Sequence, residues 1–436
     1  MRFKSTRGGD ETDLIGAVMQ GLASDGGLFV PVALPALDPG AIRAESFAGI
    51  AAELLEPFFA GSALEPELEP ICQEALDFPL ILKELRGEPE PLAVLELFHG
   101  PTAAFKDVGA RFLAAMIERA LPILDAADSR PVTILVATSG DTGGAVAAAF
   151  HGREGVRVGV FFPRGQVSPR QRHQLCCWGG NVRAFEVDGS FDDCQALVKT
   201  AFRDPALSGR LRLNAANSIN LGRLLPQVAY HAAGALWHYR RHGKCSSSIV
   251  PTGNLGNGLA CVWARAIGMP IDRIVLAVNA NLTIPDFLST GEWRPRPSKA
   301  TLASAMDVGD PSNMERLRNL FPDFADLRSA VAAYPVDDDE IRAQIAKDHE
   351  RFGEIWCPHT ATGFFAYDHL SAADRAAAWI VSATAHPAKF ETIVEPAIGR
   401  AVEVPPSLAG ILKLPAECEP LEPRLEALES ALADWN

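Results

Sequence analysis

The chain has 436 residues and 48% apolar side chains, enough to bury the cores of two or three domains. Its 54 acidic and 40 basic residues give a formal net charge of −14, which excludes a typical nucleic-acid-binding protein because such proteins need a basic face. Glycine (36 residues) and proline (32 residues) are too few for a collagen-like chain or a Pro/Gly-rich disordered one.

The first part of the chain differs in composition from the rest. Residues 1–95 are rich in Leu, Pro and Glu and carry weak strand signals, which predicts a mostly helical N-terminal domain. From about residue 130, short β-branched runs alternate with stretches of helical spacing. We expect strands over 131–138, 157–163, 181–189, 246–254, 273–280 and 377–385, and helices over 140–152, 169–180, 191–204 and 256–268.

The composition of the strand runs indicates how the sheets are covered. The runs are apolar without a two-residue alternation, which is typical of parallel strands buried on both faces. We therefore expect an α/β fold with doubly wound parallel sheets, one in a domain over 96–230 and one in a domain over 231–436. Proline clusters over 286–345 predict an excursion or lid on the second unit, and residues 420–435 predict an amphipathic surface helix.

Membrane insertion, secretion and metal binding find no support in the sequence. No run approaches the ~20 uninterrupted apolar residues of a membrane helix. Asp10, Glu11 and Asp13 follow the first basic residues without an intervening apolar segment, unlike a secretory signal. The eight cysteines show no CxxC spacing, so we expect free thiols, no metal site and a reducing, cytoplasmic location.

The first motif that could carry chemistry is HGPTAAFKD, residues 99–107. Lys106 follows small and aromatic residues and begins an apolar helical stretch, as a Schiff-base lysine could. Such an amine must lose its proton before it attacks a carbonyl, and burial lowers the pKa of lysine. A solvated lysine at the start of a helix explains the same residues, so this motif alone leaves both interpretations open. His99 lies in the same motif and is a candidate neighbour of the site.

The second and third motifs each lie where a predicted strand ends and a helix begins. TSGDTGG (138–144) combines hydroxyls, glycines and a carboxylate, and PTGNLGNG (251–258) is rich in glycine. Free N–H groups at a helix N-terminus bind anions, and glycines allow close approach to a phosphate. Ordinary helix caps or tight turns are the alternatives. The third motif has neither the dinucleotide-binding spacing G-x-G-x-x-G nor a P-loop lysine.

Together the three motifs resemble those of the threonine synthases, which are pyridoxal phosphate enzymes. The resemblance extends over nearly the whole chain and is thinnest over 40–90 and 315–355. It is carried further by STRGG (5–9), SDGGLFVP (24–31), FFPRGQVSPRQ (161–171), CCWGGNVRAFEVDGSFDDCQALVK (176–199), LNAANSINLGRLLPQ (213–227), TLASAMDVGDPSN (301–313) and ATAHPAKF (383–390).

The resemblance implies a fold and a set of site residues. The fold is that of the tryptophan-synthase-β-like pyridoxal phosphate enzymes, with two doubly wound parallel-sheet domains and the helical N-terminal domain. Lys106 would bond the cofactor and transfer protons, and Thr384 would face the pyridine nitrogen, where a neutral partner moderates electron withdrawal. The cofactor phosphate would be held by Gly253, Asn254, Leu255, Gly256 and Asn257. The substrate carboxylate and the ring would contact Thr138, Ser139, Asp141 and Thr142.

The sequence departs from the family pattern at three positions. The phosphate loop more often reads GNFGD, so Leu255 and Asn257 are substitutions, and Val108 replaces a common Phe. Backbone donors do not depend on the loop side chains, so we expect cofactor binding to be retained.

The implied reaction converts O-phospho-L-homoserine and water to L-threonine and phosphate, with a carbon–oxygen bond broken. The substrate phosphate needs a second anion site, which we predict at Ser218 and Arg223 in the segment that opens a helix, with Lys389 as a weaker candidate. A helix-capping sequence with a surface arginine is the alternative for this segment.

Two other functions share some of these features. A threonine or serine dehydratase, or a cysteine synthase, shares the lysine and the glycine loop but is not expected to combine GDTGG, NSIN and TAHPAKF. A non-catalytic homologue that only binds the cofactor would not be expected to keep Lys106 and all three loops. The expected partner is a small-molecule substrate, with no nucleic acid, no membrane and no obligate protein partner.

Overall fold

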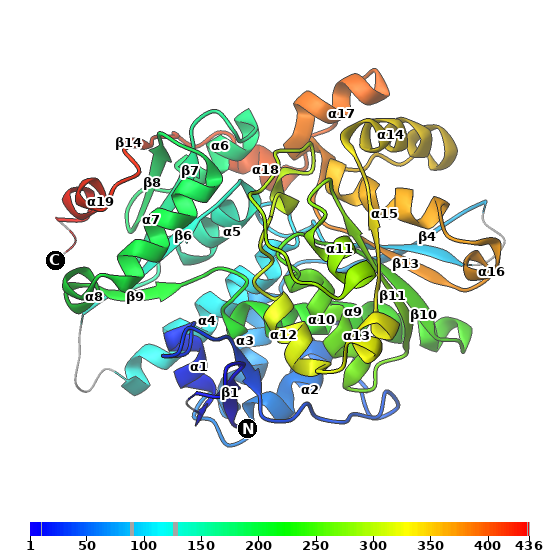
Figure 1. The fold of residues 1–436 in the computed structure, drawn as a ribbon, viewed down its shortest axis with the longest axis horizontal. Helices are drawn as coiled ribbons and strands as arrows, with labels where there is room; N and C mark the ends of the chain where they lie inside the picture. Colours follow the sequence, from blue (N-terminus) through cyan, green and yellow to red (C-terminus); the bar gives the residue numbers. More distant parts are fainter. Residues whose placement is uncertain (10, 88–90, 125–129, 434, 436) are drawn as a thin grey trace.

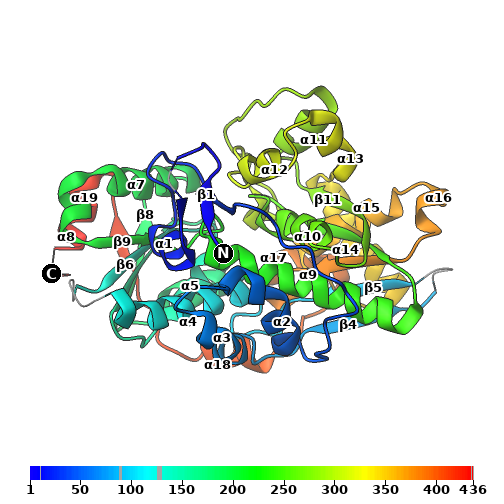
Figure 2. The same ribbon diagram turned by 90° about the horizontal axis from the view of Figure 1, so that it is seen from below.

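The computed structural model describes residues 1–9, 11–87, 91–124, 130–433 and 435. Two mainly parallel sheets lie side by side, with helices packed on their faces (Figures 1 and 2). A small antiparallel sheet lies near the N-terminus. Among the described residues, no helix is both long enough and apolar enough to cross a membrane.

The smaller parallel sheet has five strands in the order β14-β8-β7-β6-β9, all parallel to their neighbours. One face packs against α4 and α5, and the other face packs against α7. The strands are β6 (Val132–Ala137), β7 (Val156–Pro163), β8 (Val182–Val187), β9 (Arg212–Ala215) and β14 (Glu419–Leu421). The associated helices are α4 (Lys106–Leu124), α5 (Asp141–Phe150), α6 (Pro169–Cys176), α7 (Phe191–Arg203) and α8 (Pro205–Arg210).

The larger sheet has six strands in the order β12-β11-β10-β13-β5-β4, parallel except for the edge strand β4. Helix α10 packs on one face and α15 on the other. The strands are β4 (Ile81–Leu85), β5 (Leu92–Glu96), β10 (Ser246–Pro251), β11 (Ile271–Val278), β12 (Ala332–Pro335) and β13 (Trp379–Ala383). The helices of this half are α9 (Leu221–His242), α10 (Gly256–Ala266), α11 (Thr283–Thr290), α12 (Met314–Leu320), α13 (Phe324–Ala330), α14 (Asp338–Phe352), α15 (Pro358–Asp368), α16 (Ala372–Arg375), α17 (Glu391–Ile398) and α18 (Pro406–Ile411).

The N-terminal region combines helices with a small sheet. Helices α1 (Leu14–Gln20), α2 (Phe47–Phe59) and α3 (Leu68–Ala75) confirm the expected helical character. The sequence did not predict the antiparallel sheet β2-β1-β3, formed by Glu11–Thr12, Phe3–Ser5 and Phe29–Pro31. Its strands have two or three residues, too few to show an alternation.

Local signals in the sequence account for where several helices begin and end. Ser168 and Ser190 accept hydrogen bonds from the third residues of α6 and α7, and those residues bond back, forming two capping boxes. Asn220 caps α9 by accepting from Gly222 N–H, and Gly243 ends that helix in the left-handed conformation.

The predicted strands from 131–138 through 377–385 are confirmed, with ends shifted by a few residues. The predicted C-terminal helix is shorter, α19 (Leu425–Ala431), and it packs on α7 at the outer end of the smaller sheet (Figure 1). Part of that prediction, residue 434, lies outside the described residues.

The expected domain boundaries do not coincide with the sheets. Residues 230 and 231 lie inside α9, so a division there would cut a helix. Strands β4 and β5 come from the region before residue 96 but complete the larger sheet, because β5 pairs with β13. Composition changes along the chain cannot show such an exchange of strands between units.

Candidate active site

A cavity of about 400 Å³ lies where strands of both sheets end. Thr138 follows β6, Thr252 follows β10, and Thr384 follows β13, and all three line the cavity. Carboxyl ends of parallel strands are where ligands bind in doubly wound sheets. All three sequence motifs meet in this cavity.

Lys106 is the first residue of α4 and its amine faces the cavity. Its Nζ donates a hydrogen bond to Thr142 Oγ1 at 2.9 Å. Burial lowers the pKa of Lys106 to about 8, an effect that Asp141 opposes and that Arg223 reinforces. A lysine of this pKa carries a substantial unprotonated fraction at pH 8, as a nucleophile or base requires.

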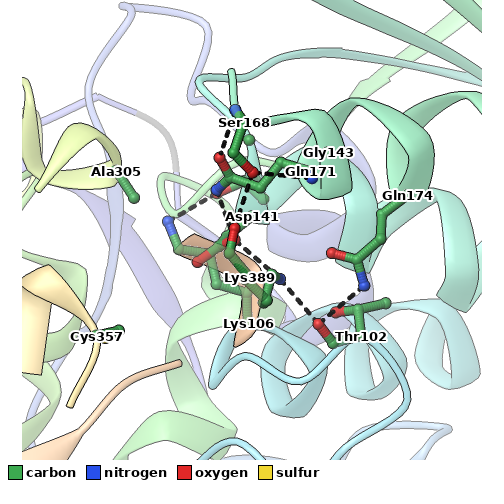
Figure 3. Close-up of polar contacts among 12 residues, drawn as sticks. Thr102, Lys106, Asp141, Gly143, Ser168, Gln171, Gln174, Ala305, Cys357 and Lys389 are labelled. Carbon is green, nitrogen blue, oxygen red and sulfur yellow. Dashed lines mark hydrogen bonds and ion pairs between the residues drawn. The ribbon is translucent and has the colours of Figure 1, made fainter. Parts of the chain in front are cut away.

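The turn that begins α5 positions four of the predicted substrate residues, but its side chains have different roles. Thr138 Oγ1 accepts hydrogen bonds from Gly140 N–H at 3.0 Å and Gly143 N–H at 2.9 Å, so this hydroxyl orders the turn. Asp141 Oδ1 lies 2.8 Å from Lys389 Nζ, so its side chain is occupied by an ion pair (Figure 3). What remains for a substrate carboxylate is the Ser139 side chain and the N–H groups at the helix start.

The glycine-rich loop leads into α10 at the end of β10. Leu255 adopts the left-handed conformation (φ 62°), which turns the chain so that the first N–H groups of α10 face the cavity. Asn257 is buried and fully engaged: its Oδ1 accepts from Tyr230 Oη at 2.6 Å and from His231 Nε2 at 3.0 Å, and its Nδ2 donates to Pro251 O at 3.0 Å. Asn257 therefore holds the loop in shape, and its backbone N–H remains available to a ligand, while its carbonyl contacts His231 Nε2 at 3.1 Å.

The glycine-rich loop can accommodate a phosphate because its backbone lies close to the backbone of a neighbouring segment, with no side chain between them. A Cβ added to Gly253 would lie 2.5 Å from Met306 Cα, so only glycine allows the loop to pass this segment. Asn254 links the loop to both sides, since its Nδ2 donates to Ser218 Oγ at 2.8 Å and its Oδ1 accepts from Ser312 N–H at 2.6 Å. A helix N-terminus, a glycine cradle and a cavity lysine together match the donor set that pyridoxal phosphate requires.

Changing Gly253 to alanine is expected to weaken pyridoxal phosphate binding by about tenfold or more, because the added Cβ displaces the loop from Met306. Titration of cofactor-free protein with pyridoxal phosphate, followed by visible absorbance, measures the effect. Gly410→Ala is the matched control, since nothing lies within 4 Å of a Cβ at that position. Equal affinities of the two variants would show that the Gly253 loop does not hold the cofactor.

Arg223 lies in the first turn of α9 and is 2% exposed, and both it and Ser218 line the cavity. Its Nη1 donates to Ala216 O, while its buried Nε has no hydrogen-bond partner. Burial lowers the pKa of Arg223 to about 10, so the guanidinium remains charged at neutral pH. A buried charged group with an unused donor is suited to an anionic ligand.

Thr384 is held next to the lysine segment. Its carbonyl accepts from Phe105 N–H at 2.8 Å, and its own N–H donates to Thr360 Oγ1 at 3.2 Å. The residue is 5% exposed and lines the cavity. It offers a neutral hydroxyl in the neighbourhood of Lys106.

Two predicted candidates do not line the cavity. His99 pairs with Glu96, with 2.7 Å between Nε2 and Oε2, and faces elsewhere. Lys389 is fully buried and is bonded to Asp141 and to Thr102 O at 2.8 Å, so it does not offer a free ammonium to a substrate phosphate.

Sequence reasoning missed several residues of the cavity wall. His359 is the second residue of α15, and its Nε2 accepts from Ala305 N–H at 3.0 Å. Lys199 from α7 and Arg296 from the predicted lid segment also line the cavity. The Cys-Pro-His-Thr sequence at 357–360 is a helix-start signal that could have drawn attention to His359. No local pattern marks Lys199 or Arg296. Among the described residues, no group of His, Cys, Asp or Glu could hold a metal ion.

Comparisons with known proteins agree along the whole chain. Residues 79–394 match the family model described as "Pyridoxal-phosphate dependent enzyme". Residues 2–76 match the model "Threonine synthase N terminus", and residues 360–432 match the model "Threonine synthase, C-terminal". The threonine synthase of Serratia marcescens is 39% identical over 409 residues, covering 92% of this chain and 91% of the relative.

Solved structures give the same result. The crystal structure of threonine synthase from Escherichia coli has a TM-score of 0.89 and 35% identity, with 100% of both chains covered. The pyridoxal-phosphate-bound threonine synthase from Brucella melitensis also has a TM-score of 0.89, with 34% identity and coverage of 100% of this chain and 99% of that one.

Proposed function

The chain belongs to the threonine synthases, a family of pyridoxal-phosphate-dependent enzymes, and on that premise we propose that it converts O-phospho-L-homoserine and water to L-threonine and phosphate. One observation supports this substrate in particular. Two candidate positions for an anion line the same cavity as Lys106: the N-terminus of α10, whose loop contacts Ser218 through Asn254, and the buried guanidinium of Arg223 in the first turn of α9. One serves the cofactor phosphate, and the other is left for a phosphate on the substrate.

The proposed reaction is a carbon–oxygen lyase reaction with net addition of water. The bond between Cγ and the phosphate oxygen breaks, Cγ gains a proton, and water supplies the hydroxyl group at Cβ. When bound, the cofactor withdraws electrons from the substrate Cα and so allows loss of its proton. The first N–H groups of α10 would hold its phosphate, and the hydroxyl of Thr384 would face its ring nitrogen.

The chain's own residues position the substrate and move its protons. Lys106 Nζ removes the proton from Cα, and the hydrogen bond to Thr142 orients this amine. The start of α5, with Ser139, binds the substrate carboxylate, while Ser218 and Arg223 bind the substrate phosphate. Fixing both ends of the substrate in this way holds Cα and Cβ within reach of one amine.

The dehydratase alternative predicts a different product from a different substrate. A phosphate-release assay with O-phospho-L-homoserine, combined with chromatographic detection of threonine, tests the proposal. An assay for keto-acid formation from serine and threonine tests for dehydratase activity. Release of keto acid from these amino acids without threonine formation from phosphohomoserine would overturn the proposed function, and no turnover of any substrate would favour a non-catalytic homologue.

Thr384→Asp is expected to shift the visible spectrum of the bound cofactor and to suppress threonine formation by about 10²-fold. A carboxylate at this position would keep the ring nitrogen protonated and strengthen its electron withdrawal. Thr384→Ser, which keeps the hydroxyl, is expected to change turnover only mildly. Near-normal activity of the Asp variant would show that Thr384 does not face the ring nitrogen.

The proposal also includes the location and partners of the enzyme. We place it in the cytoplasm, where its eight cysteines, all free in the structure, would stay reduced. Its partner in this proposal is the small-molecule substrate.

A further inference from the structure

Two buried charges of opposite sign lie beside the reactive amine. Lys389 is 0% exposed and Asp141 is 4% exposed, and their Nζ and Oδ1 atoms are 2.8 Å apart. Figure 3 shows Lys389 between Asp141 and Thr102, with Lys106 close by. No step of the proposed reaction uses Lys389. A buried ammonium next to a reactive amine needs a reason, because burying a charge is unfavourable unless it is paired.

The position of Lys389 is fixed from both ends. Its carbonyl accepts from Ser168 Oγ at 2.8 Å, so the capping residue of α6 holds its backbone. Its Nζ donates to Thr102 O at 2.8 Å, and Gln174 Nε2 donates to the same oxygen at 3.1 Å. Lys389 is therefore anchored at its backbone and at its ammonium, with little freedom to move toward a ligand.

Asp141 is held by the same set of contacts. Besides Lys389, its Oδ1 accepts from Gln171 Nε2 at 3.0 Å. Burial alone would raise the pKa of Asp141, but the Lys389 ammonium, together with His359 and the hydrogen bond from Gln171, outweighs burial, and the pKa falls to about 2. Asp141 is thus a fully ionised carboxylate at neutral pH, and its negative charge acts on Lys106 as well.

The other groups that face Lys106 come from three elements. Arg223 on α9 is cationic, and its charge lowers the pKa of Lys106, as the charge of Lys389 also does to a smaller extent. His359 on α15 accepts a hydrogen bond at Nε2, and burial lowers its pKa to about 4, so it is neutral at pH 7. Asp107 on α4 accepts from both N–H and Oγ1 of Thr102, at 2.9 and 2.6 Å, and burial raises its pKa. Asp141 is accordingly the carboxylate whose charge opposes deprotonation of Lys106.

We propose that Lys389 is a positioning residue that holds the Asp141 carboxylate and thereby prevents it from pairing with Lys106. This inference rests on Lys106 being the reactive amine of the proposed function. Without the ammonium of Lys389, the carboxylate would be a buried anion without its counter-ion, and Lys106 is the amine that its charge already reaches. Pairing would keep Lys106 protonated and turn it away from Thr142.

The test measures the basicity of Lys106 directly in the full-length, cofactor-free protein. Acetic anhydride acetylates only unprotonated amines, so the rate of acetylation of Lys106, followed against pH by mass spectrometry with a reference amine, gives its pKa. Lys389→Met is expected to raise that pKa by about 1 or more, which is about a tenfold slower acetylation at pH 7. Asp141→Asn is expected to lower the pKa.

The double variant Lys389→Met/Asp141→Asn decides whether Lys389 acts through Asp141 or directly on Lys106. If Lys389 acts through Asp141, the pKa of Lys106 in the double variant is expected to stay near that of Asp141→Asn, because no carboxylate is left to pair with the amine. Lys389→Arg, which keeps the charge, is expected to retain the wild-type pKa. Lys413→Met, an exposed lysine, is the matched control.

Two results would overturn the proposal. One is an unchanged pKa of Lys106 in a folded Lys389→Met protein, with folding checked by a cooperative thermal transition. The other is a double variant in which the pKa of Lys106 is about 1 or more above that in Asp141→Asn, which would show that the Lys389 charge acts on Lys106 directly. If Lys389→Met alone does not fold, the comparison of Asp141→Asn with the double variant carries the test. Turnover of phosphohomoserine is measured in a separate assay. A protein that does not form threonine would contradict the proposed function, whereas the acetylation rates test only the role of Lys389.

Discussion

Lys106→Ala is expected to remove nearly all threonine formation while the protein remains folded. Turnover should fall by about 10³-fold or more, because the variant loses the amine that we propose transfers the substrate protons. The side chain faces a cavity and donates a hydrogen bond to Thr142, and the nearby Asp141 carboxylate keeps Lys389 as its counter-ion, so loss of the amine leaves no unpaired buried charge. The phosphate-release assay and the thermal transition together measure both parts of this expectation.

Borohydride reduction identifies the lysine independently of turnover. Reduction of the wild-type protein with bound pyridoxal phosphate, followed by mass spectrometry, is expected to place the cofactor on the peptide that contains Lys106. Lys413→Ala, at an exposed position away from the cavity, serves as the control and should keep both the label and the activity. A label on any other lysine, or full activity of Lys106→Ala, would contradict the assignment.

Arg223→Ala is expected to lower kcat/KM for phosphohomoserine by about 10²-fold, mainly through KM. Truncating one partner of a buried charged contact costs ~2–5 kcal/mol, and Arg223 is a buried cation that lines the cavity. The proposed position of the cofactor phosphate is the start of α10, so the visible spectrum of the bound cofactor should stay normal. Steady-state kinetics and that spectrum separate the two phosphate sites.

Inhibition by inorganic phosphate gives a second measurement of the same site. Phosphate is a product, and its inhibition should weaken in Arg223→Ala, whereas inhibition by homoserine, which lacks the phosphate, should not change. Arg241→Ala is the control, because Arg241 lies on the same helix but pairs with Glu84 at the surface. An unchanged kcat/KM in Arg223→Ala would remove this residue from the substrate site.

The interior strands and the three binding loops could be predicted from the sequence because their signals are local. Each of β6, β10 and β13 is a short apolar run followed by small, polar or glycine-rich residues, and each of these ends lines the cavity. The short strands β1, β2 and β3 could not be predicted, since two or three residues carry no periodicity. Assignment of β5 to the larger sheet was also out of reach, because it depends on pairing with a strand almost at the other end of the chain.

In the candidate site, too, local motifs could be predicted from the sequence, whereas contacts between distant residues could not. Lys106, the glycine loop and the start of α9 are recognisable motifs, and the structure brings them to one cavity. The functions of individual side chains within a motif depend on what they touch. Asp141 and Lys389 are far apart in the sequence, and only their ion pair shows that neither side chain is free for a substrate.

The pairing of β5 with β13 links the chemistry of this protein to the order of its synthesis. Residues 92–96 emerge early from the ribosome, but their partner strand, residues 379–383, emerges near the end. The same late segment encloses the lysine motif, since Phe105 N–H bonds Thr384 O and His386 N–H bonds Ala103 O. Until that segment arrives, Lys106 is an ordinary solvated amine with a pKa of ~10.4, and β5 has an unpaired edge that favours aggregation. A chain stopped before residue 379 would therefore be an aggregation hazard, not a weakened enzyme.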